Sequence, residues 1–116
     1  MRALALAFEV ERYYTAVESL LARLLRTLDG SIPSGHAWHL ELLSAAAARV
    51  DDGRPPLIGE EALEDLREVL KFRHLARHGY ETEPELRRME EHAERVARAH
   101  AALGVSFDAL AAWLRT

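Results

Sequence analysis

The stretch VERYYTAVESLLARLLRTL, residues 10–28, carries a single apolar stripe at helical spacing. Its apolar side chains recur at steps of three and four residues: Val10, Tyr14, Val17, Leu21, Leu24 and Leu28. Residues at those steps share one face of an α-helix, and such a face must pack against another element. The spacing predicts a helix over residues 3–28, closed at Asp29-Gly30 with Gly30 in the left-handed conformation.

The rest of the chain has a similar composition. Alanine, leucine, glutamate and arginine, which are strong helix formers, dominate it, and no stretch shows the alternation of a β-strand. Further helices are expected at residues 36–50, 60–79 and 84–104, with a short last helix from Ser106. The fold class is therefore all-α. We expect an antiparallel up-and-down four-helix bundle with a short fifth C-terminal helix, as one domain over residues 1–116.

Histidines and tryptophans accompany the predicted core. In the fourth predicted helix an apolar seam alternates steps of three and four residues: Leu86, Met89, Ala93, Val96, His100 and Leu103. This register predicts that His100 lies in the core or at an interface and that His92 is exposed. Trp38 and Trp113 are expected to be core or interface anchors.

Composition excludes several classes of protein. The 116 residues carry a formal net charge of −4, which argues against a general nucleic-acid coat protein. There is no cysteine, hence no disulfide and no thiolate metal site. No apolar run approaches the ~20 residues that span a bilayer, and Glu9 and Glu11 interrupt the apolar start. We expect a soluble, cytoplasmic protein with no membrane partner.

One segment has the opposite charge from its surroundings. The sequence KFRHLARHGY, residues 71–80, holds three cationic side chains, two histidines and a tyrosine between acidic segments at 60–70 and 81–91. We call it the basic island. Cations are favoured in the last turns of a helix, so the island can be purely structural. Charge separated this sharply also indicates a local site for an anion.

The island contains the residue types for metal-independent RNA cleavage. Histidine exchanges protons near neutral pH, and arginine binds phosphate through two parallel hydrogen bonds. On an ideal helix Arg73 and His78 sit about 140° apart, which is not one face. A site that uses both therefore needs a looser last turn or a second subunit.

The pattern Arg73-x4-His78-x-Tyr80 resembles the Arg-x4-His-x-Tyr motif of the HEPN superfamily, in its branch of HepT-like toxins. Other short sequence segments resemble the same family: Ile32-Pro33, Trp38-His39, Leu42-Leu43 and Arg54-Pro55-Pro56. The resemblance covers about residues 10–103 and agrees with the helical reading above.

The resemblance implies a function and a set of site residues. Arg73 and His78 fall on the positions of the ribonuclease pair, with His74 and Arg77 in support. Tyr80 falls on the tyrosine that receives AMP from a partner, a minimal nucleotidyltransferase that acts as antitoxin. The protein is then expected to be a homodimeric endoribonuclease toxin that acts on RNA without metal or cofactor.

Two other functions remain open. The acidic turn at residues 81–85 departs from the family pattern and would repel RNA. It favours a catalytically silent subunit that binds a nucleotidyltransferase and helps present its substrate. The alternative is an all-α interaction domain with a structural island. The histidine pairs 74/78 and 36/39 have no acidic residue at a known ligand spacing, so no metal site is predicted.

Overall fold

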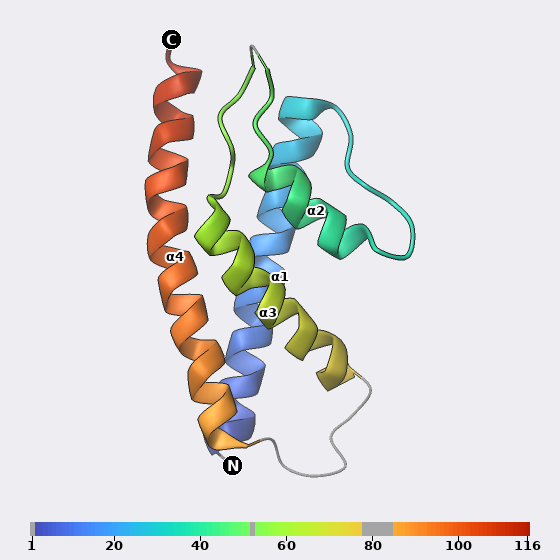
Figure 1. The fold of residues 1–116 in the computed structure, drawn as a ribbon, viewed down its shortest axis with the longest axis vertical. Coiled ribbons are helices and arrows are strands. Elements are labelled where there is room, and N and C mark those ends of the chain that lie inside the picture. The colour runs from blue at the N-terminus through green and yellow to red at the C-terminus, as the bar shows by residue number, and fades with distance from the viewer. Residues whose placement is uncertain (1, 52, 78–84) are drawn as a thin grey trace.

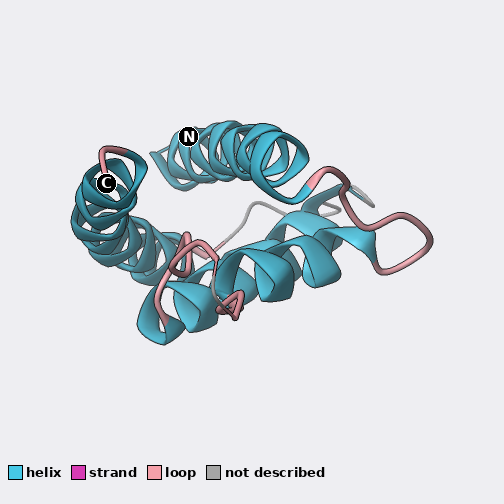
Figure 2. Cartoon of the chain, turned by 90° about the horizontal axis from the view of Figure 1, so that it is seen from above, coloured by secondary structure: helices cyan, strands magenta, loops and turns pink. Residues whose placement is uncertain are grey.

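The computed structural model describes residues 2–51, 53–77 and 85–116, with the backbone alone for 74–77. This part of the chain forms four helices and no strand: α1 Arg2–Asp29, α2 Trp38–Ala47, α3 Glu60–Arg77 and α4 Leu86–Leu114 (Figures 1 and 2). The all-α class is therefore confirmed. The predicted end of the third helix near Gly79 and the start of the fourth near Pro84 lie outside the described residues.

Helix α1 follows its prediction closely. Gly30 has a φ of +86°, and its N–H donates to the Arg26 carbonyl at 3.1 Å. The left-handed glycine thus ends the helix where the sequence places it. Val10, Tyr14, Val17 and Leu21 of the predicted stripe are buried, whereas Leu24 and Leu28 are only partly buried and Leu25 is buried beside them.

The helix directions differ from an antiparallel bundle. In Figure 1, α1 and α4 both run from the bottom to the top, whereas α3 descends obliquely between the two ends. Helix α4 packs on α1 and α3, and α2 packs on α1 and α3. The short α2 does not span the length of the molecule, so the chain makes only one full descent, through α3, before α4 ascends.

The predicted short fifth helix does not form as a separate element. Helix α4 runs without interruption from Leu86 through Gly104 to Leu114. A glycine inside a helix costs only about 1 kcal/mol relative to alanine. Leu103 before Gly104, and Phe107 and Leu110 after it, pack on the same side of α4, and this packing outweighs that cost.

The predicted exposure of His92 was wrong, and His100 lies outside the core of this chain, so its place at an interface stays a prediction. His92 is buried and stacks on Phe72 of α3, with ring centroids 4.9 Å apart, whereas His100 is exposed and hydrogen-bonds the Tyr13 hydroxyl at 3.1 Å. The buried positions step from Met89 by three residues to His92 and by seven more to Ala99, whereas the predicted seam steps by four to Ala93 and by seven more to His100. The residues buried on α4 are Met89, His92, Ala99, Leu103 and Leu110.

Arg54 explains why α2 ends at Ala47 rather than at the predicted residue 50. Its side chain is buried and makes two 2.8 Å contacts to the carboxylate of Asp29, at the end of α1. It also donates to the carbonyls of Ala45, Ala48 and Pro55, each at 3.1 Å. The Arg54 side chain thus donates to carbonyls at the end of α2. In a longer helix these carbonyls would accept backbone N–H groups of the next turn.

The molecule is a thin slab of 50 × 30 × 18 Å. Several large apolar side chains stay exposed on it: Phe8, Leu20, Leu40, Val50, Val105, Trp113 and Leu114. Trp38 packs against the core as predicted, but Trp113 does not belong to the core of this chain. Within the described ranges, none of the helices combines the length and the apolar character needed to cross a bilayer.

Candidate functional site

Arg73, the first residue of the motif, lies beneath the surface. It comes from α3 and its residue is only 5% exposed. Its Nη1 donates to Glu18 Oε1 of α1 at 3.2 Å, and its guanidinium carbon lies 5.2 Å from the centre of the Tyr14 ring. The cation is therefore held by one carboxylate and by the face of an aromatic ring.

Glu18 is the centre of this arrangement. Its carboxylate accepts hydrogen bonds from the Tyr14 hydroxyl at 3.0 Å, from His39 Nδ1 at 2.6 Å and from Arg73. These four residues, from α1, α2 and α3, are called the Glu18 cluster. An ionised carboxylate only accepts, so the proton shared with His39 belongs to Nδ1, and Nε2 is the nitrogen that Glu18 does not bind.

Tyr14 is fixed as a hydrogen-bond donor. Burial raises the pKa of the Tyr14 phenol well above its usual range, and the neighbouring Glu18 carboxylate raises it further. A second anion next to Glu18 would be unfavourable in this buried place. The phenol therefore keeps its proton throughout the working pH range and orients Glu18.

The Arg73 side chain has donor capacity beyond its bond to Glu18. Its Nε is buried and has no hydrogen-bond partner in the described part of the molecule. A buried donor without a partner costs about 1–3 kcal/mol and is found more often at functional sites than elsewhere. That Arg73 binds phosphate directly stays a prediction.

The rest of the motif is described only in part. His74 and Arg77 lie in α3, which continues to Arg77, but their side chains lie outside the described atoms. His78 and Tyr80 lie outside the described residues. Arg73 is thus the one predicted site residue whose side-chain contacts can be followed.

Three members of the Glu18 cluster were not predicted as site residues. Tyr14 and Glu18 are spaced i, i+4, so their side chains meet on one face of α1. A carboxylate beside the buried stripe of a helix needs a cationic partner, but the sequence does not show which cation that is. His39 belongs to the Trp38-His39 segment that resembles the family and to the histidine pair 36/39, for which no metal site is predicted.

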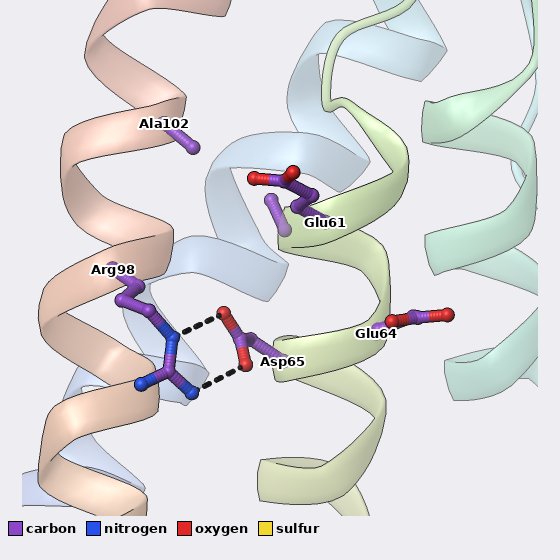
Figure 3. Close-up of a pocket in the computed structure, with 6 residues that line it drawn as sticks. Glu61, Glu64, Asp65, Arg98 and Ala102 are labelled. Carbon is purple, nitrogen blue, oxygen red and sulfur yellow. Dashed lines mark hydrogen bonds and ion pairs between the residues drawn. The ribbon is translucent and has the colours of Figure 1, made fainter.

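Metal binding has no support in the described residues. No group of three or more histidine, aspartate or glutamate side chains within those ranges is arranged to hold an ion. A separate hollow of about 300 Å³ between α3 and α4 is lined by Glu61, Glu64, Asp65 and Arg98 (Figure 3). There Arg98 Nη2 lies 3.0 Å from Asp65 Oδ1, so the cation already has a partner, and the pair joins the two helices.

Comparison with known proteins gives one match. Residues 5–114 match the family model described as HepT-like protein. No curated protein and no solved structure matches the chain. The matched range contains all four helices almost completely, together with the basic island and the Glu18 cluster. Because the family model covers nearly the whole chain, this protein belongs to the HepT-like family of HEPN-type proteins.

Proposed function

We propose that the protein is the toxin of a toxin–antitoxin pair and acts as a metal-independent endoribonuclease. The observation that carries this proposal is the Arg73-x4-His78-x-Tyr80 motif in a chain that matches the HepT-like family over residues 5–114. The motif supplies a proton-transfer group and a cation within six residues of the chain, and cleavage of RNA through its own 2′-hydroxyl requires both groups.

In the proposed reaction His78 transfers the proton and the Arg73 cation stabilises the negative charge that develops on the phosphorus oxygens. The 2′-oxygen attacks the neighbouring phosphorus, its proton passes to a base, and the departing 5′-oxygen receives a proton from an acid. Arg73 is rigidly positioned by Glu18 and Tyr14, and a preorganised charge stabilises a transition state better than a mobile one. His74 and Arg77 support this charge.

The proposed active form is a homodimer. On an ideal helix Arg73 and His78 would lie about 140° apart, and a second copy would complete the arrangement. The thin slab with exposed Phe8, Val105 and Leu114 has apolar surface available for such an interface. The proposed antitoxin is a minimal nucleotidyltransferase that transfers AMP to Tyr80. An attached phosphate would place negative charge beside the basic island and oppose RNA binding.

The test combines mass and activity. The protein is co-expressed with a nucleotidyltransferase encoded beside it, and its intact mass and RNA cleavage are compared with those of the protein expressed alone. Added AMP that maps to Tyr80, together with cleavage only by the unmodified form, is the expected result. Folded dimer without cleavage in either form would overturn the nuclease proposal.

A second candidate is favoured by one observation, the buried ion pair of Arg73. Glu18 offsets the charge of Arg73 within the chain, which weakens Arg73 as a direct phosphate ligand. This arrangement suits a catalytically silent subunit that binds the nucleotidyltransferase and helps present its substrate. Both candidates predict co-purification with that partner. Only the toxin predicts RNA cleavage by the isolated protein.

A further inference from the structure

A groove outside the motif opens between the start of α2 and the middle of α3. It has a volume of about 710 Å³, within the range of small-molecule sites. Its lining residues come from both elements: His36, Ala37, His39, Leu40, Arg67, Leu70 and Lys71. The groove therefore lies between the Trp38-His39 segment and the helix that carries the basic island.

The charged groups of the groove are all of one kind. Among the described residues that line it, Lys71 and Arg67 are cationic, His36 and His39 are imidazoles, and none is a carboxylate. Lys71 is 72% exposed, and within the described side chains its ion-pair partner is Glu68, at 3.1 Å on the same helix. Exposed pairs of this type contribute little, so Lys71 remains available to a ligand. The groove is therefore complementary to an anion.

The backbone at the start of α2 and the side chain of Arg67 also favour a negatively charged ligand in the groove. Helix α2 starts there, and its N-cap residue Ala37 provides no side-chain hydrogen bond to the first turn. Uncapped N–H groups and the positive end of the helix dipole favour an anion. Arg67 donates to Ser44 Oγ at 3.3 Å, but its Nε is buried without a partner in the described chain.

The floor of the groove is apolar. Leu40 is 45% exposed there, and Leu70 and Ala37 extend the same surface. A ligand that fits both features carries an anionic group next to a flat apolar body, as a nucleotide does. We propose that this groove holds one nucleotide unit of a single-stranded RNA, with its phosphate against Lys71 and Arg67 and its base on Leu40 and Leu70.

The groove is connected to the motif arginine through Glu18. His39 lines the groove and donates to Glu18 Oε2, while Arg73 donates to Glu18 Oε1. His39 and Arg73 thus lie on opposite sides of the same carboxylate. The inference rests on the proposed function, because it names where its RNA substrate is held.

The test measures binding without cleavage. A fluorescent 2′-O-methyl hexanucleotide, which the reaction cannot cleave, is titrated against the wild-type protein and two variants, Lys71→Glu and Leu40→Ser. Matched controls are Arg12→Glu, whose side chain is 79% exposed outside the groove, and Leu20→Ser, at a leucine outside the groove that is 43% exposed. Because all four positions are exposed, each variant should fold, and circular dichroism checks this.

Lys71→Glu is expected to weaken binding about tenfold and to reduce the slope of log affinity against log salt by about one. Leu40→Ser is expected to weaken binding about threefold with an unchanged slope, since it removes apolar contact alone. In NMR spectra the imidazole signals of His39 should shift during the titration. Groove variants that bind as well as their controls, or an unmoved His39 signal, would overturn the inference.

Two further outcomes separate this inference from the proposed function. If the groove variants lose binding but the wild-type protein cleaves no RNA, the nuclease proposal fails and the groove stands. If the wild-type protein cleaves RNA and the groove variants bind normally, the groove fails and the nuclease stands. AMP that binds as tightly as the hexanucleotide would show a mononucleotide site and would overturn the RNA assignment.

Discussion

The Glu18 carboxylate and the Arg73 guanidinium form a buried ion pair of 3.2 Å across α1 and α3, although 55 positions separate them in the chain. Neither side chain is more than 8% exposed. The arginine of the motif is therefore not a free surface cation. Its position depends on a glutamate from the first helix, which also fixes Tyr14 and His39.

Glu18→Gln is expected to destabilise the protein by about 3 kcal/mol, because it leaves Arg73 buried without a counter-charge. Urea unfolding followed by circular dichroism measures the loss. The matched control is Glu9→Gln on the same helix, whose carboxylate is 69% exposed and pairs with Arg12. A pair of that type contributes less than about 1 kcal/mol. Equal losses in the two variants would contradict the central role of the buried pair.

The double variant Glu18→Gln/Arg73→Met tests whether the loss in Glu18→Gln comes from leaving the Arg73 charge buried without a partner. Removing both charges should restore part of the stability that Glu18→Gln loses, since no unpaired charge is left in the interior. Losses that simply add would mean that the two residues act independently.

The Glu18 cluster also shows how far sequence reasoning reaches. Arg73 was identified from a local pattern, because the motif lies within eight consecutive residues. Its partners lie on two other helices, so only the packing of α1, α2 and α3 brings them together. The spacing of Tyr14 and Glu18 was visible in the sequence, but it does not reveal which cation they meet.

The fold was predictable in its elements but not in its arrangement. Periodicity located α1 and the start of α3 because each carries a continuous apolar stripe. The parallel run of α1 and α4 depends on the short α2 and on the contacts of Arg54, which are tertiary effects. The low helix propensity of Gly104 predicted a break in α4. The helix continues because the residues before and after Gly104 pack against the core, which propensity does not take into account.

Arg54→Lys is expected to cost about 2 kcal/mol in the free energy of unfolding. Lysine keeps the charge but cannot form the two-pronged contact with Asp29 while bonding the carbonyls of Ala45 and Ala48. The hydrogen bond from Arg54 lowers the pKa of the Asp29 carboxyl, so this pKa should rise in the variant. Arg12→Lys, at an exposed position, is the control for both measurements. An unchanged Asp29 titration would show that the contact has no energetic weight in solution.

His78→Ala is expected to lower RNA cleavage by at least about 100-fold, because proton transfer by a positioned histidine contributes this much or more. Initial rates on a structured RNA and on an unstructured oligonucleotide measure the effect. His100→Ala is the matched control, since His100 is an exposed histidine of α4 that contacts Tyr13. Retention of full cleavage by His78→Ala would remove His78 from the proposed reaction.

His92 should make stability depend on pH. Burial lowers the pKa of the His92 imidazole below its usual value of 6.5, and Arg95, which donates to its Nδ1 at 3.2 Å, lowers it further. The carboxylates of Glu68 and Glu91 act in the opposite direction, but their effect is smaller. The folded protein therefore disfavours the proton that the unfolded chain accepts.

The sign of the effect follows from this difference. When the pH falls below 6.5, the unfolded state binds a proton that the folded state resists, so stability declines down to the folded-state pKa of His92. Asp29, whose pKa lies below 3.8, acts only at a lower pH. His92→Phe keeps a ring on Phe72 but cannot titrate, so its unfolding free energy should decline less between about pH 7 and pH 5. His100→Gln should retain the wild-type decline, and a His92→Phe curve parallel to it would assign the acid sensitivity to another group.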